Sequence, residues 1–401
     1  MSNSFDFPIA YLNSNDGSSI LAFGKKESLV IKDKNSLLQL SEFLKDNSSN
    51  YIFGALNYNI KNEVEEIISS NRDETDFPQL IFFVPSCVVK IDHENFEFLQ
   101  GEKSAKNFEF LNYFLEEETD RNFHDLKIEW RSRTKKENYI QNVTNIKELI
   151  RQGEVYEMNY CQEFFAENCV IDYPLDFYFK LNEITKAPFS AYFQFDEYTV
   201  FCGSPERFLK KEGKKLISQP IKGTARRSED NKLDEQLKNE LKNNPKERAE
   251  NIMIVDLVRN DLSKVAEKNS VQVEELCEIY SFETVHQMIS TVVCEVNDAF
   301  SFVDILKATF PMGSMTGAPK LRAMEIIDEL EDFSRGIYSG SIGYISPNGD
   351  FDFNVVIRSM IYNSKKKYIS CPVGGAITLD SNPEQEYQEC QTKISRILDL
   401  K

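Results

Sequence analysis

Histidine is scarce in this sequence, and cysteines in close pairs are absent from it. The chain has three histidines, and its eight cysteines are scattered singly along it. Zinc and redox sites usually need such residues at short spacings, so the sequence argues against both and favours reduced, buried thiols. A metal ion would have to be held by carboxylates, which favours a hard cation such as Mg²⁺.

Positive charge is also in short supply. Lys and Arg together number 47 against 65 Asp and Glu, which gives a net charge of −18 and a pI near 4.8. Such a molecule repels phosphate backbones and anionic membrane surfaces, so we expect no nucleic-acid partner. No segment approaches the roughly 20 apolar residues that span a bilayer, and the first residues do not resemble a signal peptide. We therefore expect a soluble, cytoplasmic protein without membrane association.

Low-complexity tracts and internal repeats are absent as well. Apolar residues make up 41% of the 401 residues, which is ordinary for a folded protein with a sizeable core. Residues 1–133 carry short β-like runs but no recognisable chemistry, and we interpret them as an N-terminal subdomain. The chemical motifs lie in residues 134–401. No Gly/Ser-rich or Pro-rich linker separates the two regions, so we expect one compact unit.

The apolar pattern predicts long antiparallel strands interrupted by helices. Thr134 and Glu137 form a capping-box pattern at the start of an amphipathic helix. Residues 231–266 are predicted to be helical, and the run IMIVDLVRNDL within them predicts a helix buried on nearly every side. Asn382 followed by Pro383 predicts the start of the final helix. Because the regular βαβ alternation of a nucleotide-binding sheet is missing, the predicted class is α+β.

The final helix carries two acids and a base on one face. Glu386, Glu389 and Lys393 are spaced i, i+3 and i+7. A solvated surface stripe explains this spacing, and so does half of a Mg²⁺ site. Glu250, beside the apolar run IMIVDLV, could supply the other half, since a buried carboxylate needs a metal or a cationic partner. An ion pair with a nearby arginine is the alternative.

Further along, a glycine pair and a single arginine interrupt apolar sequence. Gly374 and Gly375 lie near the end of a predicted strand, where bare backbone N–H groups could approach an anion or simply form a bulge. Arg358 is predicted to lie in the middle of an apolar strand, VVIRSM. A guanidinium there needs an anionic partner, and a carboxylate clamp is one natural answer.

Glu206 and Lys222 form a further candidate pair. Glu206 follows a predicted strand and turn in GSPERFL, and Lys222 lies sixteen residues later in PIKGT, on a predicted loop. Both side chains could be plain surface charge. A lysine in an apolar, glycine-bounded turn can instead have its pKa lowered enough to act as a nucleophile.

In these residues the sequence resembles the chorismate-utilising enzymes. This family includes the large subunits of anthranilate synthase and aminodeoxychorismate synthase, and the isochorismate and salicylate synthases. The resemblance runs from about Thr134 to the C-terminus. It is carried, in fixed order, by GSPERFL, PIKGTARR, AENIMIVDLVRNDLSKVA, FPMGSMTGAPKLRAMEIIDELE, RGIYSGSIGYISPNGDFDFNVVIRS and DSNPEQEYQECQTK.

The resemblance implies two facing antiparallel sheets flanked by helices, with chorismate and Mg²⁺ bound between the sheets. It implies Glu250 and Glu389 as direct metal ligands, with Glu386 beside the metal. It also implies Glu206 as the general acid that protonates the departing C4 hydroxyl. His286 falls at a family active-site position, although a buried, hydrogen-bonded histidine is an equally simple interpretation. The implied substrate-binding residues are Arg358, Lys393, Tyr344, Thr224, Gly374, Gly375 and Ala376.

Two positions separate the members of this family. The water-adding enzymes carry a lysine where this chain has Glu157, a position where we would otherwise expect glutamine. Anthranilate synthases generally have alanine in the loop that carries Lys222, whereas aminodeoxychorismate synthases have the lysine. The resemblance therefore implies an aminodeoxychorismate synthase of the folate route, in which Lys222 adds to the ring. Anthranilate synthase and a catalytically inactive chorismate-binding relative are the alternatives.

The nitrogen source is expected to lie outside this chain. The sequence shows no Cys-His-Glu glutaminase, and its cysteines lie outside any nucleophile-elbow pattern. The resemblance then implies ammonia supplied by a glutamine amidotransferase subunit. The first ~130 residues do not match the tryptophan-binding segment of anthranilate synthases, so feedback control by tryptophan is not expected.

Overall fold

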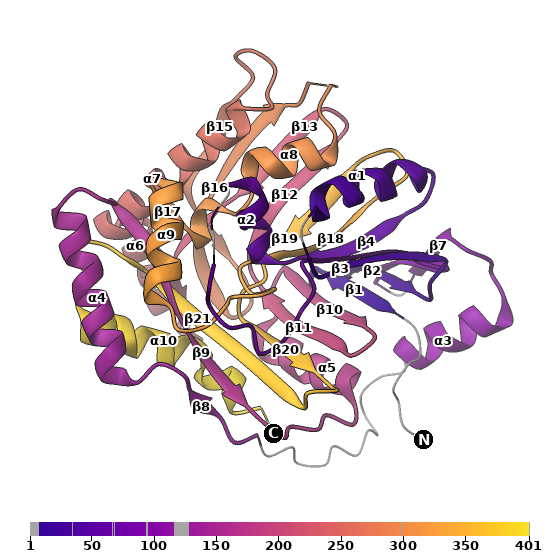
Figure 1. Ribbon diagram of the computed structural model, residues 1–401, viewed down its shortest axis with the longest axis horizontal. Helices are drawn as coiled ribbons and strands as arrows, with labels where there is room; N and C mark the ends of the chain where they lie inside the picture. Colours follow the sequence, from indigo (N-terminus) through magenta and orange to yellow (C-terminus); the bar gives the residue numbers. More distant parts are fainter. Residues whose placement is uncertain are drawn as a thin grey trace.

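The computed structural model describes residues 8–115, except 34, 66, 68 and 94, and residues 128–400, except 298. Within them the chain forms two antiparallel β-sheets that face each other, with helices packed around them (Figure 1). The predicted α+β class is confirmed. No helix of this part of the chain has the length and apolarity that crossing a bilayer requires.

The first sheet has eleven strands among the described residues. Strands from the region after residue 150 form one edge of this sheet. Strands from the N-terminal region form the other edge. Its order is β17 (Gly317–Ala318), β9 (Glu157–Ala166), β21 (Tyr368–Ile377), β20 (Ser359–Asn363), β11 (Tyr198–Ser204), β10 (Phe189–Phe195), β1 (Ile9–Asn13), β2 (Ser18–Phe23), β6 (Cys87–Asp92) and β7 (Asn95–Gln100), with β8 (Arg131–Ser132) also paired to β9.

The second sheet has ten strands in the same part of the chain. Its order is β14 (Ile221–Arg226), β16 (Val285–Glu295), β13 (Lys215–Gln219), β12 (Arg207–Glu212), β19 (Phe351–Asn354), β18 (Ser341–Ile345), β4 (Ile52–Leu56), β5 (Leu80–Val84) and β3 (Glu27–Ile31), with β15 (Gln272–Ser281) also paired to β16. Residues 1–133 thus contribute strands to both sheets.

The helices lie mainly on the outer faces of the two sheets. In Figure 1, α10 and α4 lie beside β9 and β21, whereas α1 and α3 lie near the N-terminal strands. The helices are α1 (Ser36–Asp46), α2 (Lys61–Val64), α3 (Ala105–Leu115), α4 (Lys136–Arg151), α5 (Pro174–Thr185), α6 (Asn231–Asn243), α7 (Pro245–Ser263), α8 (Phe302–Thr309), α9 (Lys320–Leu330) and α10 (Pro383–Leu398).

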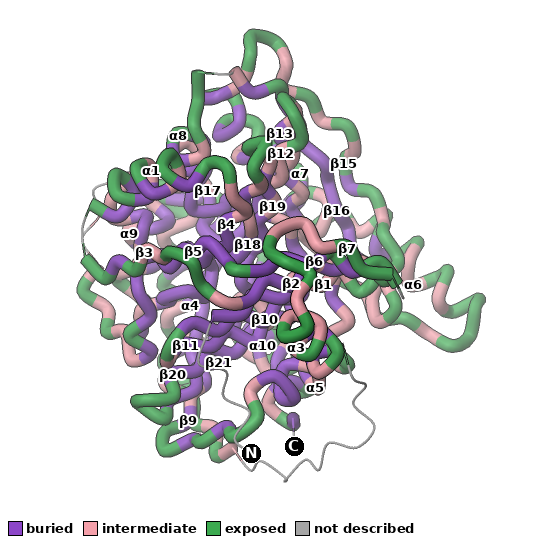
Figure 2. The backbone as a smooth tube through the Cα atoms, turned by 90° about the vertical axis from the view of Figure 1, so that its right-hand side faces the viewer, coloured by how far each residue is buried: buried purple, intermediate pink, exposed green. Residues whose placement is uncertain are grey.

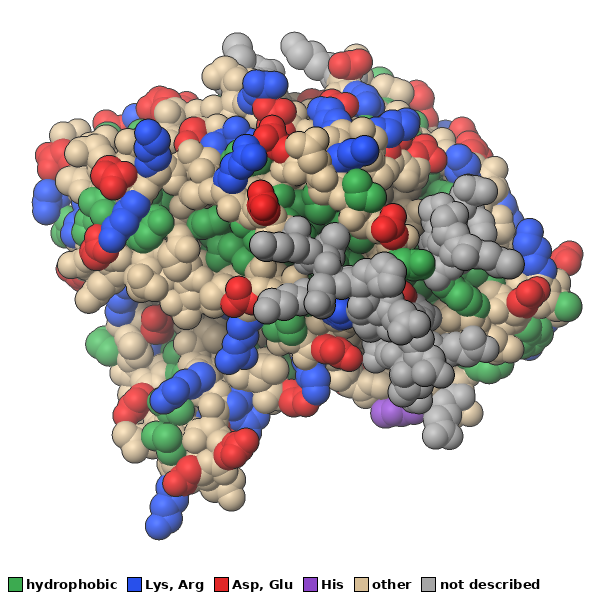
Figure 3. All heavy atoms as spheres, turned by 90° about the horizontal axis from the view of Figure 1, so that it is seen from below, with side chains coloured by type: hydrophobic (Ala, Val, Ile, Leu, Met, Phe, Trp, Pro, Cys, Tyr) green, Lys and Arg blue, Asp and Glu red, His purple; other side chains and the backbone are tan. Residues whose placement is uncertain are grey.

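Strand alternation divides the apolar residues between two cores. On β10, Ala191, Phe193 and Phe195 face the core between the sheets, whereas Tyr192 faces the core under the outer helices. This is the period of two that a pleated strand imposes. Most strand residues are buried, and the exposed residues gather at turns and on projecting helices (Figure 2). On the face shown in Figure 3, acidic and basic side chains are interspersed, so this face carries no patch of one sign.

Three sequence predictions need correction. The helix expected at Thr134 begins at Lys136, because the Thr134 hydroxyl donates to Asp332 Oδ1 at 2.9 Å instead of capping the helix. The single helix expected over 231–266 is two helices, because Asn244 caps the start of α7 and Pro245 occupies its first turn. Arg358 lies outside any strand, in a bend between β19 and β20.

Helix α7 is also less buried than its apolar run suggested. Ile252 is 39% exposed, and it lines an open surface groove of about 600 Å³. Asp256 and Asn260 line the same groove, whereas Ile254, Val255 and Val258 face the core. The helix therefore has one solvent face and one buried face. Helix α10, by contrast, begins with Asn382 as cap and Pro383 in its first turn, as predicted.

Candidate active site

A lysine and a glutamate from different sheets meet at the centre of the candidate site. Nζ of Lys222 on β14 lies 2.9 Å from Oε1 of Glu157 on β9, and the two side chains are 10% and 2% exposed. The register of β14 against β16 shifts between Ile221 and Thr224, and Gly223 there has φ +84°. Such a bulge redirects a side chain out of the regular alternation. Lys222 thereby projects across to the first sheet.

The Lys222 environment differs from the predicted one. The residue lies on a strand rather than a loop, and the charged side chains that act on it are carboxylates rather than an apolar turn. Burial acts to lower the pKa of Lys222, but the charges of Glu157 and Glu250 outweigh it, so that the pKa is raised. The prediction of a lowered lysine pKa is therefore wrong. Lys222 is held here as an ammonium ion.

Glu206 lies at the start of β12 and is almost completely buried, at 5% exposure. A register shift between Arg207 and Leu209 follows it directly. Burial raises the pKa of Glu206 to about 7, and the charge of Lys222 acts in the opposite direction. A carboxyl with this pKa is protonated for part of the time at neutral pH. It can therefore donate a proton, as a general acid must.

Helices α7 and α10 bring their carboxylates together around a lysine. Nζ of Lys246 lies 3.8 Å from Oε1 of Glu250 on its own helix and 3.8 Å from Oε1 of Glu386 on α10. Burial raises the pKa of Glu250 to about 7, and its Oε1 is buried without a hydrogen-bond partner. The alternative partner, an arginine, is not used, because Arg248 donates to a backbone carbonyl and Arg259 pairs with Asp256.

The polar face predicted for α10 converges on Gly375. A Cβ atom on Gly375 would lie 3.6 Å from Glu386 Oε2, 3.6 Å from Lys393 Nζ and 3.9 Å from Glu389 Oε1. Lys393 also pairs with Glu389 at 2.8 Å and donates to the carbonyl of Gly374 at 2.9 Å. The missing side chain at Gly375 therefore keeps the space between α10 and β21 open.

Gly374 and Ala376 belong to the regular ladder between β21 and β9. A Cβ on Gly374 would come within 2.4 Å of Cys161 Sγ, so glycine is required there by close packing of the two strands. Gly375 pairs with Tyr160 in the same ladder, and its open side faces the charged cluster. Packing explains Gly374, and a role of Gly375 in anion binding stays a prediction.

Arg358 adopts the left-handed backbone conformation, with φ +51°. A non-glycine residue in this region costs on the order of 1 kcal/mol or more, and such strain gathers at functional sites. Its electrostatic neighbours are Tyr338 and Glu389, and among the described residues its guanidinium forms no hydrogen bond or ion pair. Arg358 is thus available for an anion.

Two further residues were predicted to bind the substrate, Tyr344 and Thr224. Tyr344 on β18 stacks on Phe53 at a centroid distance of 5.7 Å, and Asp352 lies directly across the strand pair. Thr224 on β14 is exposed. The tyrosine beside Arg358 is Tyr338, six residues earlier in the same RGIYSGSIGYI stretch. Tyr338 is therefore the tyrosine of this stretch that acts electrostatically on Arg358, and the role of Tyr344 in substrate binding stays a prediction.

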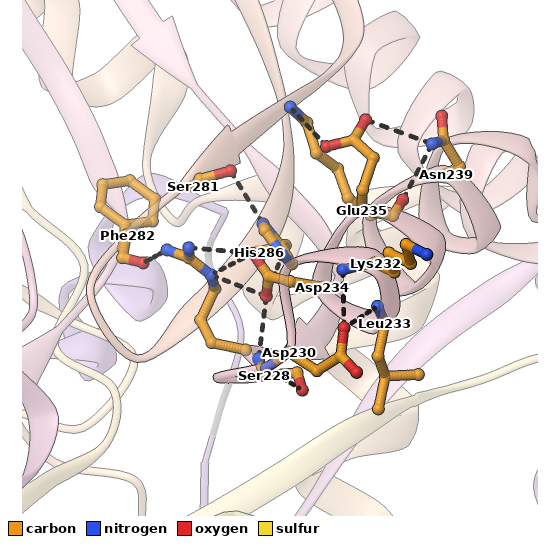
Figure 4. A network of polar contacts seen from close by, with 12 residues as sticks. Ser228, Asp230, Lys232, Leu233, Asp234, Glu235, Asn239, Ser281, Phe282 and His286 are labelled. Atoms are coloured by element: carbon orange, nitrogen blue, oxygen red, sulfur yellow. Dashed lines mark hydrogen bonds and ion pairs between the residues drawn. The ribbon is translucent and has the colours of Figure 1, made fainter.

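His286 belongs to a separate polar network. Its Nε2 lies 3.0 Å from Asp234 Oδ1, and its Nδ1 lies 2.8 Å from the Ser281 hydroxyl, so both ring nitrogens are occupied (Figure 4). Asp234 pairs in turn with Arg227, whose hydrogen bond lowers the pKa of Asp234. The structure therefore supports the simpler interpretation, a buried histidine that ties β16 to α6.

The carboxylates do not form a complete metal site as they stand. In the described ranges, no three acidic, histidine or cysteine side chains are placed so that they could hold a metal ion. Glu250 and Glu386 nevertheless share a cation, the ammonium of Lys246, and both are largely buried. Oxygen donors of this kind suit Mg²⁺. Lys246 was not predicted as a residue of this site. Its position four residues before Glu250, on the same face of the helix, is the feature of the sequence that could have indicated the ion pair.

A family model described as chorismate binding enzyme matches residues 7–399. This chain therefore belongs to the family of chorismate-binding enzymes, as the sequence motifs predicted.

Curated relatives narrow the class. Aminodeoxychorismate synthase component 1 of Bacillus subtilis is 32% identical over 426 residues, which cover 98% of this chain and 88% of that protein. The protein of the same name in Escherichia coli is 40% identical over 273 residues, 68% of this chain, and only 59% of that protein is covered. Anthranilate synthase components occur among the relatives too. The relatives confirm the predicted enzyme class and favour aminodeoxychorismate synthase over anthranilate synthase.

A solved structure confirms the fold. Anthranilate synthase component I from Streptococcus pneumoniae TIGR4 superimposes with a TM-score of 0.81 and 28% sequence identity, covering 95% of this chain and 92% of that one.

Proposed function

We propose that this chain binds chorismate and aminates it at C4, forming 4-amino-4-deoxychorismate in the cytoplasm for folate synthesis. The observation that carries the proposal is a buried lysine, Lys222, which shares one electrostatic environment with the buried acid Glu206. These are the two groups that the reaction needs in order to activate the ring and to release its hydroxyl.

Charge balance supports a dianionic substrate together with a divalent metal. Six carboxylates and four cationic groups are grouped here, and chorismate would add two further negative charges. With every group ionised the excess is four negative charges, and a divalent cation offsets half of it. The groups are Glu157, Glu206, Glu247, Glu250, Glu386 and Glu389 with Lys222, Lys246, Lys393 and Arg358.

Magnesium would be held by the carboxylates of Glu250 and Glu389, with Glu386 beside it, once Lys246 gives up its place between Glu250 and Glu386. When bound, the ion would neutralise the ring carboxylate and hold it in place. The second carboxylate of chorismate suits Arg358, Lys393 and the backbone amides beside Gly375. Arg358 supports this assignment, because its guanidinium forms no ion pair with the described residues.

The chemistry on the ring assigns one task to each buried group. Protonated Glu206 donates its proton to the C4 oxygen, which leaves as water. The amine of Lys222 forms a bond to C2 as the C4–O bond breaks, and the ring double bonds shift. Ammonia then attacks C4, the double bonds shift back, and the C2–N bond to Lys222 breaks. The enolpyruvyl group stays attached throughout.

Ammonia would come from a partner glutamine amidotransferase. All eight cysteines of this chain are buried and unpaired, which suits a reducing cytoplasm and leaves no exposed thiol for glutamine hydrolysis. The partner would therefore carry the nucleophilic cysteine, and this chain would receive free ammonia.

Mass analysis of the product tests the proposal. Purified protein with chorismate, Mg²⁺ and an ammonium salt should form 4-amino-4-deoxychorismate, with the enolpyruvyl group retained. Release of pyruvate with formation of anthranilate would instead identify an anthranilate synthase, and isochorismate would identify water addition. Loss of chorismate with none of these products would leave the proposal without support.

A further inference from the structure

Glu157 is the one carboxylate in hydrogen-bond contact with Lys222 among the described residues. Its Oε1 accepts from Nζ at 2.9 Å, and this contact joins the first sheet to the second. Both side chains are shielded from water, with exposures of 2% and 10%. An ion pair in such a place is unusual, because burying two charges costs more than their attraction commonly returns. A role in the reaction would account for it.

The second oxygen of Glu157 is also informative. Oε2 is buried and has no hydrogen-bond partner in the structure. A buried carboxylate oxygen without a donor is unfavourable while the group is ionised, and the penalty falls when that oxygen binds a proton. One oxygen of Glu157 therefore accepts a hydrogen bond from the Lys222 ammonium, and the other oxygen is free to accept a proton.

The other acids near Lys222 act on it only at longer range. Glu206 at the start of β12, Glu247 and Glu250 on α7, and Glu389 on α10 all interact electrostatically with Lys222, without a hydrogen bond to it. Glu206, Glu250 and Glu389 have tasks in the proposed function. Of the acids without one, Glu157 is in hydrogen-bond contact with Lys222 and Glu247 is not.

We propose that Glu157 accepts the proton of the Lys222 ammonium when chorismate is bound, and that it returns this proton when the lysine is released. The inference rests on the proposed role of Lys222 as nucleophile. The transfer turns an ion pair into a neutral amine and a neutral carboxyl group, which a site closed to water favours. The amine then holds the lone pair that forms the bond to C2.

Protons and electrons balance over the cycle. Glu157 takes one proton from Lys222, and Glu206 gives one to the departing hydroxyl, which leaves as water. Ammonia arriving at C4 becomes an ammonium group and returns a proton to Glu206. When the C2–N bond breaks, its electron pair leaves with the nitrogen of Lys222, and Glu157 gives its proton back to this neutral amine. Chorismate and ammonia yield the aminated product and water.

A glutamine at this position would keep a hydrogen bond to Lys222 but could not take its proton. Glu157→Gln is therefore the informative variant, and Glu157→Asp is its conservative partner because it keeps a carboxylate. The readout is kcat/KM for ammonia-dependent product formation from pH 6 to 10, with chorismate affinity and unfolding temperature measured alongside.

We expect Glu157→Gln to lose at least ~100-fold in kcat/KM at neutral pH, the usual minimum for a lost general base. Relative to the unmodified protein, its kcat/KM should then rise about tenfold per pH unit toward the pKa of a lysine, because Lys222 must lose its proton to solvent, whereas Glu206 and ammonia titrate alike in both proteins. Glu157→Asp should keep the pH profile of the unmodified protein at a lower rate. A merely structural role predicts parallel pH profiles for all three proteins, and that result would overturn the inference.

Two controls keep the outcome clear. If Lys222→Ala retains the full rate and product, the proposed function of Lys222 fails, and the Glu157 inference fails with it. If Lys222→Ala is inactive but the Glu157→Gln profile parallels that of the unmodified protein, the failure belongs to Glu157 alone. Should Glu157→Gln not fold, Glu157→Asn removes the same proton acceptor and carries the same pH prediction.

Discussion

The carboxylates of Glu250 and Glu386, which lie 136 residues apart in the sequence, both come within 3.8 Å of one lysine ammonium. Two acids that share one cation are poised to exchange it for another of higher charge. This relationship underlies the proposal that α7 and α10 together hold a metal ion, to which each helix would contribute a carboxylate.

The metal prediction follows directly. Glu250→Ala and Glu389→Ala should abolish magnesium-dependent turnover while leaving the fold intact, because each removes an oxygen donor on a different helix. Binding is measured separately from activity, by titrating Mn²⁺ into the chorismate-free protein and following its electron spin resonance signal. Asp256→Ala is the matched control, since Asp256 is an exposed acid on α7 that pairs with Arg259. Full turnover in excess chelator would contradict the assignment.

Glu206 should impose a pH dependence on both activity and stability. With a pKa of about 7, the group is increasingly deprotonated above neutrality, so the general-acid step should weaken as pH rises through 7. Glu206→Gln should lose 10²-fold to 10⁴-fold in kcat while chorismate binding persists. The matched control is Glu212→Gln, at an exposed position on the same strand.

The free energy of unfolding should also depend on the protonation of Glu206. Burying this acid should destabilise the fold as pH rises, whereas an ordinary salt-bridged acid stabilises the fold as pH rises. The pKa of Glu206 is raised on folding, so its stabilising contribution is complete below the unfolded pKa near 4.5 and is lost as pH rises through about 7. The loss is on the order of 3 kcal/mol at alkaline pH. Urea unfolding of Glu206→Gln at pH 5 and pH 8.5 should therefore show a smaller pH difference than the unmodified protein shows.

The nitrogen source can be tested with the chain alone. Because every cysteine is buried, the purified protein should use ammonium salts but not glutamine, until an amidotransferase is added. Glutamate release is the direct measurement. Glutamine hydrolysis by this chain by itself would show that it carries a glutaminase after all.

Local features of the fold were predictable from the sequence. The Asn382–Pro383 start of α10 and the shared face of Glu386, Glu389 and Lys393 depend on residues within two helical turns, and the structure has both as predicted. The break between α6 and α7 was missed although it is local too. Pro245 begins α7, whereas the sequence prediction placed it inside one long helix.

Contacts between the sheets were not predictable in the same way. Glu157 and Lys222 meet because β9 and β14 lie on facing sheets, and no local period encodes that approach. The same holds for Arg358, whose left-handed bend depends on the chain passing from one sheet to the other. The approach of Tyr338 to Arg358 is a contact of this kind as well. Two tyrosines in one motif differ only in where the strand turns them.

The central claim is that Lys222 forms a covalent bond to the ring. The most direct measurement is turnover of Lys222→Ala with chorismate, Mg²⁺ and ammonia, with the product identified by mass. Lys215→Ala, at an exposed lysine on β13 that pairs with Glu274, is the control. We predict a loss of at least ~100-fold in 4-amino-4-deoxychorismate formation with chorismate affinity retained, because the carboxylate-binding groups are untouched. An unchanged rate and an unchanged product would remove Lys222 from the mechanism and contradict the account.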